Sequence, residues 1–294
     1  MQGPQNKLEL IKGPLFMLLS CALFSVMGGL IRYLSLNDIH PFMTAFIRTL
    51  VAVLFLIPTF SKVGIKGLKT DRLGLHCFRG VMSAIAVIAS FYAVSVIPLA
   101  VSTSYSFAAP VFATILAVIF LKEKIRLPRI TAVIIGFIGV LVLLRPGSAP
   151  FNSGVAAALI GAFTVAFTII CIRSLSQTDK PNVVAVYALL FTLPISFLVA
   201  LTEWKIPEPE FWWAVIMVGF CAALAQYSIA KAFSQSETTA ILPIDFTRLI
   251  FATTIGYIFF SEVPDFYTFF GASLILASAV YAAHRESILK RDNL

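Results

Sequence analysis

Ten long apolar runs, joined by short polar segments, dominate this chain of 294 residues. A helix needs about 20 mostly apolar residues to cross the hydrocarbon core of a bilayer. Backbone groups in that core must be hydrogen-bonded within the protein, and runs this long and this apolar favour helices over barrel strands. We therefore predict an all-α membrane protein with ten transmembrane helices. The runs cover residues 13–33, 43–60, 77–97, 100–121, 130–144, 154–172, 183–201, 211–233, 239–260 and 266–283.

The composition points to the same class of protein. Apolar residues make up 59% of the chain and charged residues 12%, against about 45–50% and about 25% in ordinary soluble domains. Ten spans leave no room for a soluble catalytic domain, so we do not expect an enzyme. Lys7 and Lys12 precede the first run, as in a signal peptide, but the run is long for one and no small-residue cleavage motif precedes Arg32. We therefore count this run as a span.

The basic residues are unevenly distributed around the ten runs. With a cytoplasmic N-terminus, 17 of the 22 Lys and Arg residues fall on the cytoplasmic side. The outer segments hold only Arg32, Arg145 and Lys205, and Arg48 and Arg248 fall inside spans. This bias predicts that both termini are cytoplasmic. It also accounts for the net charge of +8, so the charge does not require a nucleic-acid partner.

Two sequence blocks recur in the second half of the chain. Residues 112–123 read FATILAVIFLKE and residues 251–262 read FATTIGYIFFSE, with six identities in twelve positions at an offset of 139. Residues 31–35 read IRYLS and residues 172–176 read IRSLS, at an offset of 141. Two blocks in the same order at nearly the same offset indicate an internal duplication.

Each copy of the duplication holds five spans. The predicted halves are residues 1–147 and 152–285, followed by a cytoplasmic tail at 286–294. Because five is odd, the second copy enters the membrane from the opposite side, which makes Glu123 cytoplasmic and Glu262 external. Two inverted five-helix repeats are typical of secondary transporters, whose substrate site lies near the midplane between the halves.

Residues 78–147, with FRG, FYAVSVIPLAVSTSYSFAAP, an LKE turn and GFIGVLVLLRPG, resemble EamA-type members of the drug/metabolite transporter superfamily. Residues 241–262, with LPIDFTRLIFATTIGYIFFSE followed by VPD, resemble them as well. The resemblance covers nearly the whole chain. It implies a multi-pass protein of a bacterial inner membrane that moves small organic metabolites by alternating access. Family members handle amino acids, S-adenosylmethionine, riboflavin and other metabolites, and these motifs do not choose among them.

Ionisable residues inside spans are the first candidates for a substrate site, because such groups are costly in lipid and usually face a cavity or a partner. Asp245 and Arg248 lie three residues apart on one predicted helix face. They could bind a zwitterionic substrate, or they could form a structural ion pair. Arg48, which resembles an Arg of the family's second helix, has either a structural role or a substrate contact.

Gln226, Tyr227 and Lys231 of the eighth run are further candidates for a substrate site, although their spacing does not require that all three share a helix face. Lys231 could extend to the cytoplasmic interface or bind an anion inside the protein. Its repeat counterpart is Tyr92. Tyr105 and Tyr227 could stack on a flat substrate. Because Pro110 and Pro243 are not matched by the offset, the sequence does not predict symmetric helix breaks.

No cofactor or metal is expected. The three His residues lie at span ends without a ligand cluster, the four Cys residues are isolated, and the GxxxxGK[ST] phosphate-loop motif does not occur. The leading hypothesis is a secondary carrier of a small molecule, surrounded by membrane lipid. A proton or metabolite counter-substrate and a homodimer stay open. A membrane enzyme would need a set of acids, bases or nucleophiles near one face, and a channel would need rings of charge or carbonyls.

Overall fold

The computed structural model describes residues 7–121, 127–144, 151–175, 177–235, 244–245 and 247–291. Every regular element in these residues is helical, which confirms the all-α class for this part of the chain. Glu123 and Pro243 lie outside it. The helices are α1 (Lys7–Leu36), α2 (Pro41–Gly67), α3 (Leu73–Val96), α4 (Leu99–Ser106), α5 (Ala109–Leu121), α6 (Leu127–Leu144), α7 (Ser153–Leu175), α8 (Pro181–Ala200), α9 (Trp212–Gln235), α11 (Thr247–Phe260) and α12 (Phe266–Arg291), with short 3-10 turns η1 (Leu201–Glu203) and η2 (Pro209–Phe211).

Six of the described segments are long and apolar enough to cross a membrane. Four shorter apolar helices accompany them, and each predicted run overlaps one of these ten segments. The molecule is therefore a multi-pass membrane protein by length and composition. The count of ten complete spans and the cytoplasmic termini stay predictions.

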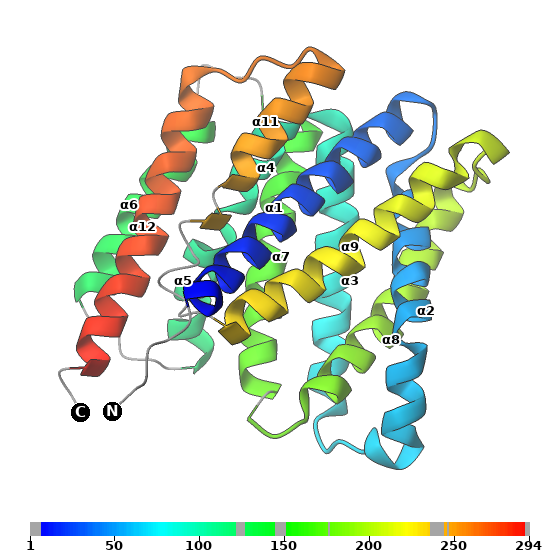
Figure 1. The fold of residues 1–294 in the computed structure, drawn as a ribbon, viewed down its shortest axis with the longest axis horizontal. Coiled ribbons are helices and arrows are strands. Elements are labelled where there is room, and N and C mark those ends of the chain that lie inside the picture. Colours follow the sequence, from blue (N-terminus) through cyan, green and yellow to red (C-terminus); the bar gives the residue numbers. More distant parts are fainter. Residues whose placement is uncertain are drawn as a thin grey trace.

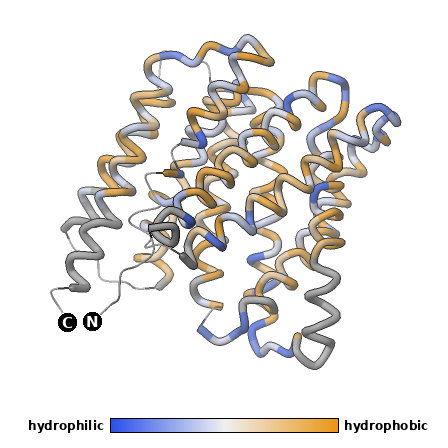
Figure 2. The backbone as a smooth tube through the Cα atoms, viewed as in Figure 1, coloured by the Kyte–Doolittle hydropathy of each residue, from blue (hydrophilic) through white to orange (hydrophobic). Residues whose placement is uncertain are grey.

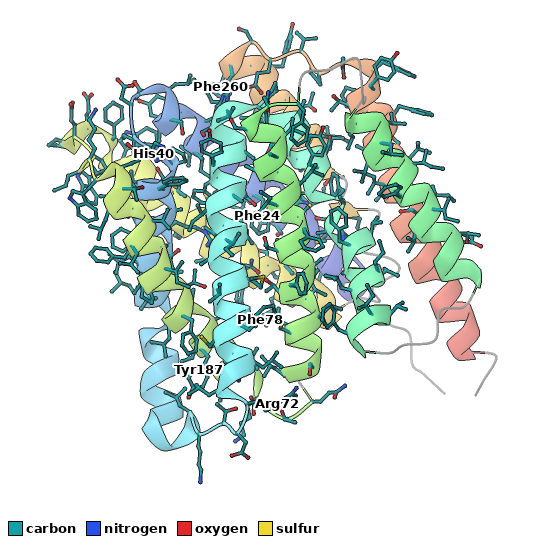
Figure 3. The ribbon with its side chains drawn as sticks, turned by 180° about the vertical axis from the view of Figure 1, so that it is seen from behind. Phe24, His40, Arg72, Phe78, Tyr187 and Phe260 are labelled. Carbon is teal, nitrogen blue, oxygen red and sulfur yellow. The ribbon has the colours of Figure 1, made fainter. Side chains whose placement is uncertain are left out.

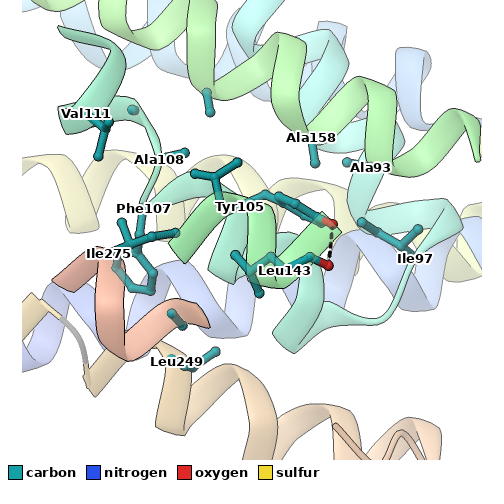
Figure 4. Packing of buried hydrophobic residues seen from close by; sticks show 14 of the residues in the cluster. Ala93, Ile97, Tyr105, Phe107, Ala108, Val111, Leu143, Ala158, Leu249 and Ile275 are labelled. Carbon is teal, nitrogen blue, oxygen red and sulfur yellow. Dashed lines mark hydrogen bonds between the residues drawn. The ribbon is translucent and has the colours of Figure 1, made fainter. Parts of the chain in front are cut away.

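Helices from the two halves of the sequence pack against each other. Helix α1 packs on α9, α3 on α7, and α6 on α12, and α2 also contacts α8. Figure 1 shows α1 and α9 crossing the front of the bundle, with α3 and α7 behind them and α6 and α12 along the left edge. The largest buried apolar cluster draws on α3 to α7, α11 and α12, so the core lies between the halves (Figure 4).

The contact between α6 and α12 depends on two glycines. A Cβ atom at Gly139 would lie 2.8 Å from the carbonyl oxygen of Gly271, and one at Gly271 would lie 2.9 Å from the carbonyl oxygen of Gly139. Glycine lets the two backbones approach this closely. Membrane helices without a hydrophobic driving force between them associate through such small-residue contacts.

The bundle has an apolar outer surface and polar ends. Hydrophobic residues line the helices and hydrophilic ones gather at the turns (Figure 2). Large apolar side chains point outward along the helices, among them Leu198 (62% exposed) and Ile258 (64% exposed), as expected of a surface that faces lipid. Figure 3 shows His40 and Phe260 at one end of the bundle and Arg72 and Tyr187 at the other. We call these the His40 end, predicted to be external, and the Arg72 end, predicted to be cytoplasmic.

Candidate functional site

The predicted fourth span is broken in the middle of the bundle. Helix α4 stops at Ser106, Phe107 and Ala108 form a turn, and α5 begins at Ala109. Pro110 explains the break, because its ring cannot fit against the carbonyl of the preceding helical turn and it has no N–H to donate. Backbone groups at the break form hydrogen bonds across three residues instead of four. The N–H of Phe107 donates to the Ser104 carbonyl at 3.2 Å, and that of Ala108 donates to the Tyr105 carbonyl at 2.9 Å.

The predicted ninth span packs beside the broken fourth span. It is helical at Ile244 and Asp245 and again in α11 from Thr247. The Thr247 hydroxyl donates to the Ile244 carbonyl at 2.7 Å, a separation of three residues that is typical of a helical turn. Helix α11 contacts α4, so this segment of the second half lies against the broken span of the first half.

Asp245 and Arg248 lie at the start of α11, but they do not form the ion pair expected as one alternative. In the described part of the chain, ion pairs join only Arg32 to Glu262 and His76 to Asp179. The Asp245 carboxylate instead lies 3.7 Å from the Cys21 thiol of α1. The Arg248 guanidinium lies over the Phe107 ring, 5.0 Å from its centroid, and its buried Nε has no hydrogen-bond partner.

The positions of the two charges explain why they stay apart. Ser25 and Cys21 of α1 hold the backbone around them: the Ser25 hydroxyl donates to the Arg248 carbonyl at 3.0 Å, and the Cys21 thiol lies 3.6 Å from the Asp245 carbonyl. Asp245 lies in a helical segment three residues before Arg248. The two side chains nevertheless contact different neighbours, the Cys21 thiol for Asp245 and the Phe107 ring for Arg248. An acid and a base therefore lie near the helix break without neutralising each other.

Arg48 resembles Arg248 in its surroundings. Its guanidinium lies 5.9 Å from the centroid of the Phe91 ring on α3, and its Nε is buried without a hydrogen-bond partner. Among the described residues, Arg48 thus combines an aromatic contact with an unused Nε donor, which can serve a ligand or water.

The three candidates on α9 do not face the interior together. Gln226 and Tyr227 are exposed, with Tyr227 55% accessible on the outside of the helix, while Ala225 and Ser228 are buried. The Lys231 ammonium lies 5.7 Å from the centre of the Tyr227 ring, on that outward side. Gln226 and Tyr227 are therefore not enclosed by the bundle, and their role in a site stays a prediction. This geometry favours the interfacial role for Lys231.

Tyr105 and Tyr92 lie in the apolar core and near the His40 end, respectively. Tyr105 is 2% exposed within the apolar core, and its hydroxyl donates to the Leu143 carbonyl at 3.1 Å (Figure 4). Stacking of Tyr105 on a substrate is therefore not supported. Tyr92 lies near the His40 end, where its hydroxyl donates to Ser153 Oγ at 3.1 Å.

Arg32 and Glu262 form a contact that sequence reasoning missed. Their side chains are 17% and 9% exposed, and Arg32 Nη2 lies 3.2 Å from Glu262 Oε1. Arg32 Nη1 also donates to the Ser95 carbonyl at 2.6 Å, and the N–H of Leu99 donates to Glu262 Oε2 at 2.7 Å. The pair thus satisfies backbone groups on both sides of the turn between α3 and α4. The available sign was that both residues lie in the repeated blocks.

A second polar cluster joins the halves at the Arg72 end. His76 Nε2 lies 2.7 Å from Asp179 Oδ2, and the Thr70 hydroxyl donates to the same oxygen at 2.9 Å. Arg72 donates to the carbonyl of Ser174 at 2.9 Å and to its hydroxyl at 2.7 Å. The hydrogen bond from His76 lowers the pKa of Asp179 below its ordinary value. This cluster links the turn before α3 to the turn before α8.

A cavity of about 600 Å³ opens at the His40 end. Of the predicted site residues only Tyr92 lines it, together with the turns at 35–41 and 202–205 and the last two turns of α3. Burial lowers the pKa of His40, which lines the cavity, below its ordinary value of 6.5, so its ring is neutral at pH 7.

Comparison with known proteins relates the whole chain to transporters. The sequence matches the EamA-like transporter family twice, over residues 11–145 and 152–283. It is 28% identical over 281 residues to a riboflavin transporter of Vibrio cholerae, covering 94% of each chain. It is 29% identical over 269 residues to an S-adenosylmethionine uptake transporter of Rickettsia conorii, covering 92% of this chain and 91% of the relative.

A solved crystal structure has the same fold. Its TM-score with this chain is 0.62 at 19% sequence identity, over 93% of this chain and 98% of the other. Together with the matches above, the helical architecture assigns the protein: the chain belongs to the EamA-like transporter family.

Proposed function

We propose that this protein is a secondary transporter that moves a small organic metabolite across a bacterial inner membrane by alternating access between two inverted five-helix halves. Two family matches in one chain, over 11–145 and 152–283, support the division into halves. The packing supports the inversion. If the two halves correspond helix by helix, α1 corresponds to α7, α3 to α9 and α6 to α12. The contact between α1 and α9 then has the contact between α7 and α3 as its equivalent, and α6 packs on its own counterpart α12.

The observation that carries the proposal is the unpaired acid and base at the start of α11. Transporters commonly bind their substrate near the membrane midplane, where discontinuous helices offer free helix ends and polar groups. The α4–α5 break supplies such helix ends, and Arg248 lies over Phe107 in that break. Asp245, three residues before Arg248, does not pair with it. A guanidinium binds a carboxylate in a two-pronged geometry, and a carboxylate binds an ammonium group.

These two charges favour a substrate with both an anionic and a cationic group. Amino acids, S-adenosylmethionine and related compounds have this character, and a relative is named for S-adenosylmethionine uptake. Riboflavin is the alternative, because other relatives are named for it. A proton or a counter-transported metabolite is the proposed driving solute. A homodimer is compatible with this scheme.

The test is counterflow into proteoliposomes that hold purified protein. Vesicles preloaded with an unlabelled solute should accumulate the labelled form, with amino acids, S-adenosylmethionine and riboflavin as the panel. We expect Asp245→Asn and Arg248→Ala each to reduce counterflow at least tenfold. The matched control is Ile250→Ala on the same helix, whose side chain is 57% exposed on the outer surface.

Two results would remove this proposal. Full counterflow by both charge variants would exclude Asp245 and Arg248 from the mechanism. Ion currents without counterflow of any solute would favour a channel. The folding of each variant is checked by its thermal unfolding in detergent, since a loss of flux counts only in a folded protein.

A further inference from the structure

The cavity at the His40 end is built by three segments that are distant in sequence. Its lining includes Ser35 in the last turn of α1 and Asp38 just after it, Glu203 and Trp204 after α8, and Tyr92 on α3. Its volume of about 600 Å³ lies within the usual range for sites that bind small molecules. The Ser35 hydroxyl oxygen is buried and has no hydrogen-bond partner. A buried polar atom of this kind calls for a partner that comes from outside the protein chain.

The chemistry of the lining favours an amine on a flat molecule. Asp38 and Glu203 contribute two carboxylates against the single ammonium of Lys205, and the ring of His40 is neutral. The indole of Trp204, which is 45% exposed, and the phenol of Tyr92 supply aromatic faces. Carboxylates attract an ammonium group, and aromatic faces bind both cations and flat rings.

Two described residues at this end of the molecule have a strained backbone conformation. Among the residues that the structure describes, only Asp38 (φ 59°) and Ser261 (φ 55°) are non-glycine residues with positive φ. Asp38 lines the cavity, and Ser261 directly precedes Glu262. Residues other than glycine adopt this conformation at a cost, and such strain tends to occur at functional sites. The two strained positions place the Asp38 carboxylate at the cavity and the Glu262 carboxylate, which follows Ser261, beneath it.

The Arg32–Glu262 pair lies directly below the cavity. Ser95 and Val96 line the cavity, and the Ser95 carbonyl accepts the 2.6 Å hydrogen bond from Arg32. On the other side of the pair, Glu262 accepts the N–H of Leu99, the first residue of α4. Helix α4 leads from this point to the break at Phe107. The pair joins α1 of the first half to the end of α11 in the second half, so the halves cannot separate here while it is intact.

We propose that this cavity is the docking site at the His40 end for a transported solute that carries an amine beside a flat ring, and that the Arg32–Glu262 pair is the seal between the cavity and the interior. The proposal rests on the proposed transport function. It assigns a binding role to Asp38, Glu203 and Trp204 and a gating role to a pair that also orders the α3–α4 turn.

The docking site is tested by protection of a reporter cysteine. Val96→Cys in a Cys77→Ser background places a thiol at the cavity, since Val96 is 40% exposed there and Cys77 is the exposed native thiol in the described residues. The reagent is the membrane-impermeant trimethylammonium-ethyl methanethiosulfonate, applied to each face of sealed vesicles. We expect tryptamine to slow labelling at least fivefold and indole-3-propionate, which carries a carboxylate on the same ring, to leave it unchanged.

Variants of two nearby glutamates give the matched comparison. Glu203→Gln should abolish protection by tryptamine, whereas Glu210→Gln, which removes an exposed carboxylate outside the cavity lining, should retain it. Equal protection by the amine and the acid, or unchanged protection in Glu203→Gln, would overturn the assigned ligand chemistry.

The seal is tested with a thiol on its inner side. Ser102 lies one turn into α4 and is 4% exposed, so Ser102→Cys in the Cys77→Ser background should resist the reagent. Adding Glu262→Gln should raise its labelling rate at least tenfold, while Glu210→Gln should not change it. Glu262→Asp, which keeps the charge, should restore most of the protection and separates loss of the seal from misfolding. Equal labelling with and without Glu262→Gln in folded protein would refute the seal.

Labelling and counterflow distinguish the two proposals. If no solute shows counterflow while the labelling pattern holds, the transport function fails and the cavity and closed pair stand. If counterflow occurs but labelling responds to neither tryptamine nor Glu262→Gln, transport stands and both the docking site and the seal are refuted.

Discussion

Replacing Glu262 by alanine should destabilise the folded bundle by about 2–4 kcal/mol. The Coulomb attraction across 3.2 Å is about 5 kcal/mol at an effective dielectric constant of about 20. Part of this is offset by the desolvation of both ions. The alanine also leaves the Leu99 N–H without its charged acceptor at 2.7 Å, which costs about 1–3 kcal/mol. Arg32 keeps its backbone carbonyl acceptors, which limits the total loss.

A double-mutant cycle measures this interaction directly. Glu262→Ala, Arg32→Ala and the double variant are unfolded reversibly in mixed micelles, and the coupling energy is taken from the four stabilities. We expect a coupling of about 1.5–3 kcal/mol, because both side chains are largely shielded from solvent. A coupling below about 0.5 kcal/mol, the range of exposed surface pairs, would refute the view that this contact holds the two halves together.

Three further predictions concern packing and pH. Gly139→Leu should lower the free energy of unfolding by more than about 2 kcal/mol, because the leucine side chain would collide with the Gly271 backbone. The control Gly74→Ala, with nothing within 4 Å of the added Cβ, should be neutral or slightly stabilising. Tyr105→Phe should lose about 1 kcal/mol with its hydrogen bond to Leu143, and an unchanged melting temperature would contradict this. The pKa of Asp179 in the folded protein lies below its ordinary value of 3.8, so the ionised carboxylate stabilises the fold above that pH, and this stabilisation is lost as the pH falls through the folded pKa. The advantage of the wild type over Asp179→Asn in thermal unfolding should therefore shrink as the pH falls below about 4.

The candidate site was only partly accessible from the sequence. Charge inside an apolar run was enough to single out Arg48, Asp245 and Arg248, because an ionisable group in lipid needs a reason to be there. It could not show that Asp245 and Arg248 stay unpaired. That outcome depends on tertiary contacts: side chains of α1 pack against both residues, and the Arg248 guanidinium lies over the ring of Phe107.

The direction in which a side chain points was harder to predict. In a soluble helix the apolar face marks the core, but in a membrane both the core and the lipid accept apolar residues, so the pattern does not distinguish inward from outward. Gln226 and Tyr227, two candidates for a site, have exposed side chains. Tyr105 was expected to meet a substrate and is buried in the packed core.

The sequence by itself determined the all-helical class, the apolar segments and the family, because these follow from length, hydropathy and repeated blocks within a single chain. Only the tertiary structure decided which distant residues meet. Arg32 and Glu262 are 230 positions apart, and His76 and Asp179 are 103 apart, so no local pattern could join them. They come together because helices of one half pack between those of the other, and low exposure then makes each pair costly to break.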